Sequence, residues 1–167
     1  MPLIDRTGST QSDAYVEVET LEELPDGQAA ILPAEVFQEH RQTLEGRNAA
    51  LGVRLPNDRP VSEIADDLNR LDAIVLEFPA FKDGRAYSQA RLLRQRHGYT
   101  GEIRATGEVL QDQAIFLVRC GFDAFQVDDH TAERWQAALR RISVVYQPAS
   151  DDSTPAPWRR QARRAAE

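Results

Sequence analysis

The strongest constraint on the fold is a regular alternation of strand-like and helix-like segments from residue 51 onward. Apolar runs that suit strands begin near residues 51, 73, 102 and 123, and apolar residues at helical spacing follow each run. Short connections between alternating strands and helices predict parallel strands joined by right-handed crossovers. We therefore expect an α/β fold with a parallel sheet built from four repeated strand–helix units.

Two architectures fit this pattern. One is an open, flavodoxin-like sheet with helices on both faces, and the other is half of a β/α barrel, which would bury its open edge by forming a homodimer. The helix expected over residues 109–120 is the only one apolar enough to be covered all round. On that ground we place the open sheet slightly ahead of the half barrel.

The rest of the chain divides by composition. Residues 1–13 are polar and predict a flexible arm, and residues 14–147 predict a single α/β domain. Within that domain, residues 14–19 and 29–32 suit two further short strands, and Pro33 suits the first turn of a helix. Residues 148–167 predict a Pro-rich linker followed by a basic tail.

Net charge limits the class of partner. The chain has 167 residues and a formal charge of -7, which disfavours nucleic acid. The segment from Trp158 to Glu167 is the exception, with four arginines and one glutamate. Such a tail can contact an acidic partner or a phosphate backbone, although a solvated chain end is the simpler interpretation.

Several classes of site lack their sequence signatures. No apolar run is long enough to span a bilayer, and Met1 to Thr10 has no secretory signal, so we expect a cytoplasmic protein. Cys120 is the single cysteine, and the three histidines lack metal-ligand spacing, so we expect neither a disulfide nor a metal site. No nucleotide-binding or Ser-hydrolase fingerprint is present, and the sequence predicts no particular cofactor.

The positions where a ligand would bind follow from the expected fold, because parallel α/β proteins bind ligands beyond the C-terminal ends of their strands. The helix that starts near Arg85 would offer free backbone N–H groups, and phosphate, sulfate, sulfite or a carboxylate could bind there. The alternative is that Asp83 only caps this helix while Lys82 and Arg85 face water. The candidate ligand-binding residues are Glu77, Lys82, Asp83, Gly84, Arg85, Arg104, Gln111, Asp112 and Gln113.

Glu77 and Cys120 could each take part in chemistry, but for both residues we prefer a structural role. Glu77 follows a buried apolar run, and an ion pair with Arg104 on the neighbouring strand is favoured over general acid–base work. Cys120, next to Arg119, is more simply a small core residue than a reactive thiol.

Three runs of this sequence resemble blocks of a known bacterial family. They extend from Glu77 to Arg94, from Gly101 to Gln113 and from Arg119 to Phe125, with weaker similarity reaching over most of residues 15–142. That family is a domain of unknown function commonly labelled an oxidoreductase involved in sulfite reduction. The resemblance implies a role beside the assimilatory sulfite reductase in cysteine biosynthesis, and it does not extend to the C-terminus from Pro148.

Two functions of different class remain. The first is an accessory protein or oxidoreductase associated with assimilatory sulfite reduction, which would bind sulfite reductase. The second is a small-anion-binding enzyme or sensor with an oxyanion pocket at the C-terminal ends of the strands.

Overall fold

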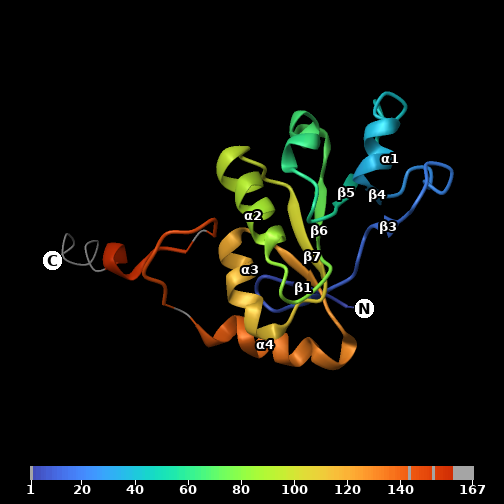
Figure 1. Cartoon of the computed structure of the whole chain (residues 1–167). Coiled ribbons are helices and arrows are strands. Elements are labelled where there is room, and N and C mark those ends of the chain that lie inside the picture. Colours follow the sequence, from blue (N-terminus) through green and yellow to red (C-terminus); the bar gives the residue numbers. More distant parts are fainter. Residues whose placement is uncertain (1, 143, 152, 160–167) are drawn as a thin grey trace.

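An eight-stranded sheet forms the centre of the protein (Figure 1). The structure is a computed structural model that describes residues 2–142, 144–151 and 153–159. The strand order is β2-β1-β8-β7-β6-β5-β4-β3, in which β3 to β8 are parallel and β1 is antiparallel to both β2 and β8. The strands are β1 (Leu3–Asp5), β2 (Thr10–Gln11), β3 (Val16–Glu17), β4 (Ala30–Pro33), β5 (Leu51–Leu55), β6 (Ala73–Phe78), β7 (Glu102–Gly107) and β8 (Ala124–Gln126).

Helices follow β6, β7 and β8, as the alternating sequence pattern predicts. The segment after β5, where apolar residues at helical spacing predict a helix, contains short 3₁₀ turns instead. Gly121 ends α3 as its C-cap, in the left-handed conformation at φ 105° that glycine adopts without strain. The elements are α1 (Ala34–Glu39), α2 (Arg85–Arg91), α3 (Ala114–Cys120) and α4 (Ala132–Arg141), the π-turn η3 (Leu92–Arg96), and the 3₁₀ turns η1 (Val61–Glu63), η2 (Ala65–Arg70), η4 (Gln111–Gln113) and η5 (Asp129–Thr131).

The strand order identifies the architecture as a half β/α barrel. From β3 to β8 each strand lies beside the next one in the chain, without the reversal of order that a flavodoxin-like sheet requires. Crossovers of one hand that always step in the same direction place their helices on the same face. Figure 1 shows α2 and α3 together on one side of the sheet. The predicted α/β fold is therefore confirmed, and its form is the half barrel. The preference for the open sheet was wrong.

A short connection shows how strongly the sheet is curled. Gln11 in β2 and Val16 in β3 belong to the two edge strands of the sheet, yet only five residue steps separate them. Five extended residues reach at most about 18 Å. Seven inter-strand spacings of about 4.8 Å would place the edges of a flat sheet roughly 34 Å apart. The sheet must therefore curve until its two edges approach each other, and residues 12–15 join them across the inner face.

The two faces of the sheet differ in polarity. Alternate strand residues such as Val53, Leu76 and Ile103 are fully buried in the core beneath the helices. The residues between them face the inner side, where Arg54 lies opposite Val75 and Val75 lies opposite Arg104. The core thus lies between the sheet and its helices, and charged side chains lie on the concave face.

The N-terminal residues depart from the expected organisation. Residues 3–5 and 10–11 form strands where the sequence predicts a flexible arm, because Leu3 and Ile4 are buried beside β8. Arg119 binds the linker from residue 148 to the body through Asp151. The basic tail lies mostly outside the described residues. Within the described part of the chain, no helix is long and apolar enough to cross a membrane.

Candidate functional site

The C-terminal ends of β6 and β7 meet in a closely packed pair of loops. Gly107 has φ 92°, and a Cβ atom there would lie only 2.3 Å from the Phe78 carbonyl oxygen. Beyond it, the Glu108 backbone N–H donates to that carbonyl at 2.8 Å, and the Glu108 carboxylate accepts from the Phe81 backbone N–H at 3.1 Å. Glycine at position 107 therefore allows the loop after β7 to lie against the loop after β6.

The expected anion position at the start of α2 is occupied by a side chain of this protein. The Asp83 carboxylate accepts from Arg85 Nη2 at 2.6 Å and from the Arg85 backbone N–H at 3.3 Å. Hydrogen bonds from Arg85 hold the pKa of Asp83 well below its usual range. Gly84 forms the N-cap, and Lys82 lies exposed beside this pair. The arrangement resembles the helix-capping alternative, with the arginine already neutralised by a neighbouring carboxylate.

The second group of candidates forms the turn before α3. Gln111, Asp112 and Gln113 make up η4, and the Gln113 side-chain oxygen accepts from the Leu110 backbone N–H at 3.0 Å. Gln113 thus stabilises the start of its own helix. Within the described residues no hydrogen bond or ion pair joins this turn to Lys82, Asp83 or Arg85.

Glu77 has a different ionic partner from the one expected. It lies on the inner face of β6, where its carboxylate is 3.4 Å from Arg54 Nε. Arg54 also contacts Glu17 at 3.1 Å and Glu19 at 2.7 Å. Burial lowers the pKa of the Arg54 guanidinium, but the hydrogen bond to Glu19 and the negative charges of Glu19, Glu77 and Glu17 together raise that pKa above its usual value. Register does not separate the two arginines, because Arg54 and Arg104 both lie opposite Val75, but Arg104 is already bound by Asp13 and Glu102.

Arg104 lies at the centre of the inner face, under the segment that joins the two sheet edges. Its side chain is only 6% exposed, and its Nη1 donates to both carboxylate oxygens of Asp13 at 2.8 Å. Its Nε binds Glu102, and its guanidinium lies 4.8 Å from the centre of the Tyr15 ring. Although burial lowers the pKa of Arg104, the hydrogen bonds that it donates to Glu102 and Asp13 raise that pKa. We call residues 12–15 the strap.

Cys120 is a free, partly buried thiol at the end of α3. Burial raises the pKa of its side chain, and the positive charges of Arg91 and Arg119 only partly offset this. Tyr87 packs edge-on against Phe78 with ring centres 5.1 Å apart, and burial raises its pKa to about 12. Both groups therefore stay protonated at neutral pH.

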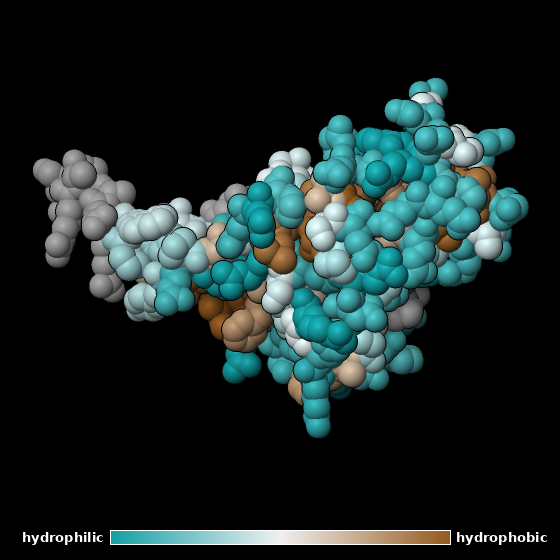
Figure 2. Space-filling view, turned by 45° about the horizontal axis from the view of Figure 1, so that its top comes forward, coloured by the Kyte–Doolittle hydropathy of each residue, from teal (hydrophilic) through white to brown (hydrophobic). Residues whose placement is uncertain are grey.

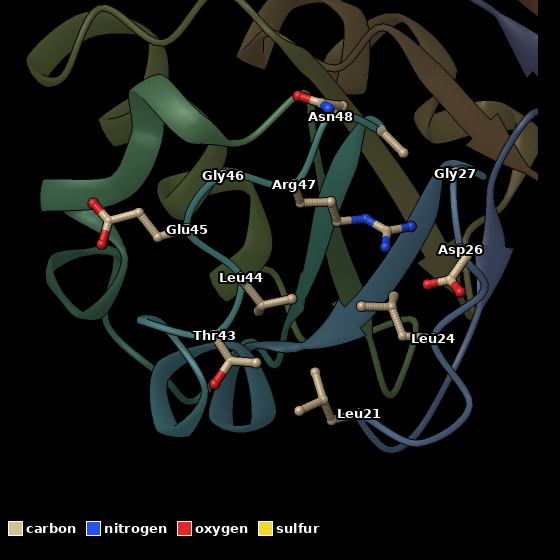
Figure 3. A pocket seen from close by; sticks show the side chains of 11 residues that line it. Leu21, Leu24, Asp26, Gly27, Thr43, Leu44, Glu45, Gly46, Arg47 and Asn48 are labelled. Carbon is tan, nitrogen blue, oxygen red and sulfur yellow. The ribbon is translucent and has the colours of Figure 1, made fainter.

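A further hollow lies at the other end of the sheet (Figure 3). It has a volume of about 540 Å³ and lies between the loops that precede β4 and β5. Leu21, Leu24 and Leu44 line its apolar part, and Arg47 points toward the turn at Gly27. The Arg47 guanidinium donates to the backbone carbonyls of Pro25 and Gln28, which is a structural use of its charge. In β/α folds this end supports stability rather than ligand binding.

The nine candidate residues therefore do not form one pocket. Asp83 pairs with Arg85, the residues of η4 stabilise their own helix, and Glu77 and Arg104 belong to separate ion-pair clusters on the inner face. Within the described ranges no three histidine, cysteine or acidic side chains are placed to hold a metal ion.

Sequence reasoning missed the partners supplied by the N-terminal residues. Asp13 is separated from Arg104 by 91 positions in the sequence, so no pattern of neighbouring residues predicts their contact. The sequence does contain a sign that Arg54 has an ionic partner. Arg54 is the charged residue within the otherwise apolar run from Leu51 to Leu55. A charge at such a position indicates the polar face of a strand and requires a partner.

A family model matches residues 52–157, and its description is "Bacterial protein of unknown function (DUF934)". The match begins in β5 and continues past Pro148, so the expectation that the family pattern stops before that residue is wrong. No curated protein matches the chain. The matched region includes the loops after β6 and β7 but not the strap.

Proposed function

We propose that this chain, which belongs to the family of bacterial proteins of unknown function DUF934, is an accessory protein of assimilatory sulfite reduction that acts by binding a partner enzyme. The sulfur context rests on the resemblance of residues 77–125. The binding role rests on the surface of the protein, where large apolar side chains are left in contact with water.

The observation that carries this proposal is the exposure of two aromatic residues beside α3. Phe116 is 64% exposed and Tyr146 is 68% exposed. Ile142 and Val144 are also exposed close to them in the chain. Large apolar side chains gathered on a soluble surface are typical of protein interfaces, where aromatic residues supply much of the binding energy.

Catalysis by the residues described above is less well supported. The raised pKa of Cys120 disfavours the thiolate that thiol redox chemistry would need. A small-anion enzyme or sensor, the second candidate, would need Arg85 to release Asp83, because the carboxylate occupies the guanidinium. Lys82 remains exposed in that loop and is the one basic group there without a described ionic partner.

Growth tests the sulfur context directly. A strain that lacks the gene is expected to grow on cysteine but poorly on sulfate as the sole sulfur source, and the gene supplied on a plasmid should restore growth. Equal growth of both strains on sulfate would refute the proposed role. Thermal-shift titration with sulfite and sulfate tests the second candidate, which requires stabilisation that Lys82→Ala abolishes.

A further inference from the structure

We propose that the partner binds the outer surface formed by α2, η3, α3, Ile142 and residues 144–151, and that its own contact surface is a protein surface with carboxylates around an apolar side chain. This inference rests on the proposed function and specifies where and by what chemistry the partner is recognised. We call this surface the arginine face.

The apolar part of the arginine face is a hollow beside α3. It has a volume of about 340 Å³, and Figure 2 shows a hydrophobic area where the C-terminal segment meets the body. A hollow of this size fits one or two apolar side chains of a partner. Its apolar lining consists of Ile115, Phe116, Ile142, Val145 and Tyr146.

A second, more basic hollow lies along α2 and η3. Arg91, Leu92 and Arg96 line it and all three are exposed. Gln95, which also lines it, donates a hydrogen bond to the Ser150 hydroxyl at 3.0 Å.

The two hollows form one continuous surface because a bound loop connects them. Arg119 lines the apolar hollow, and its guanidinium donates to the Gln147 carbonyl and contacts Asp151 at 3.4 Å. The loop is closed by a hydrogen bond from the Ala156 backbone N–H to the Val145 carbonyl at 2.7 Å. A partner that covers both hollows would therefore also contact this loop.

Charge identifies the kind of partner. Residues 1–84 contain 17 acidic and 7 basic side chains, whereas residues 85–157, which include the arginine face, contain 9 of each. Among the described residues, Arg91 and Arg96, which line the basic hollow, form no ion pair, although ion pairs are frequent elsewhere in the chain. Arginines left unpaired beside exposed apolar side chains favour a partner that brings carboxylates.

The same charges argue against a symmetric dimer through this surface. In a two-fold interface each patch meets itself, so the arginine face of one copy would lie against the arginine face of the other. Like charges placed opposite each other oppose association. A different protein with an acidic contact surface fits better.

Binding of the purified full-length chain to purified assimilatory sulfite reductase tests this inference. We expect a complex whose affinity falls about tenfold or more between 50 and 300 mM NaCl, because exposed charges are screened by salt. Arg96→Glu should weaken binding about tenfold at low salt, and Phe116→Ser should weaken it at least as much. The matched control is Lys82→Glu, which makes the same charge change in the loop after β6 and should change the affinity less than about twofold.

The outcomes separate the two proposals. If the unmodified chain binds and only Lys82→Glu weakens the complex, the arginine face is refuted while the accessory role stands. If the unmodified chain does not bind the reductase, both the accessory role and this inference fail. Circular dichroism of each variant verifies folding. Tighter binding to a random 20-base-pair DNA than to the reductase would also overturn the assignment of a protein partner.

Discussion

Removing the Asp13 carboxylate is expected to destabilise the protein by about 2 kcal/mol, because Arg104 would lose its bidentate partner. Loss of one member of a fully buried ion pair costs about 3–5 kcal/mol. Here Arg104 is buried, but Asp13 is 37% exposed and Glu102 still contacts the guanidinium. We therefore expect a smaller cost, of about 2 kcal/mol, than for a fully buried pair. Asp13→Ala should therefore lower the melting temperature by roughly 4–8 °C in a chain of this length.

Urea denaturation of a double-mutant cycle measures the contribution of the contact itself. Asp13→Ala, Arg104→Met and the double variant are compared with the unmodified chain, and Asp66→Ala removes an exposed aspartate as the control. Methionine at 104 keeps the apolar stem length, and the freed carboxylates of Asp13 and Glu102 remain partly in water. We expect a coupling free energy of about 1.5 kcal/mol and little effect of the control.

A coupling free energy near zero would refute the reasoning. In that case the strap would be held by its backbone or by Tyr15 rather than by the ion pair. Limited proteolysis gives a second measurement, because Asp13→Ala should speed cleavage within residues 12–15 if the carboxylate holds the strap on the sheet.

Three further predictions follow from other contacts. Gly107→Ala should destabilise the fold by at least about 2 kcal/mol in urea, because a Cβ there meets the Phe78 carbonyl and the positive φ is strained; unchanged stability would contradict the packing of the two loops. Iodoacetamide should alkylate Cys120 more slowly than a free thiol at pH 7.5 and faster as the pH rises, because burial raises its pKa; a fast reaction at pH 7.5 would mean an accessible thiolate. Arg119→Ala should free the loop around Asp151, which mass spectrometry of early tryptic and chymotryptic cuts would detect against an unmodified control.

Much of the fold could be predicted because its strands have clear local patterns. The strand expected to begin near residue 51 matches β5, which begins at Leu51, and the run expected near residue 73 matches β6, which begins at Ala73. The half barrel could not be distinguished in advance, because unit lengths are similar in both architectures. The difference lies in the order of the strands, which depends on packing between distant segments.

The candidate site was predicted less well than the fold. Placement at strand ends correctly located the loop of Asp83 and Arg85, but sequence could not show that these two side chains neutralise each other. The N-terminal hairpin that leads into the strap was missed because β1 and β2 are three and two residues long, too short for an alternating pattern to emerge. The contact of the strap with Arg104 depends on the curl of the whole sheet.

The pairing of β1 with β8 has a consequence for the order in which the protein can fold. Leu3 and Gln126 are partners in the same sheet, so a strand made at the beginning of synthesis must wait for one made near the end. Contacts of such long sequence separation slow folding, because chain entropy is lost before they can form. On the ribosome, β5 to β7 can assemble in sequence, whereas the hairpin of β1 and β2 completes the sheet only after β8 has emerged.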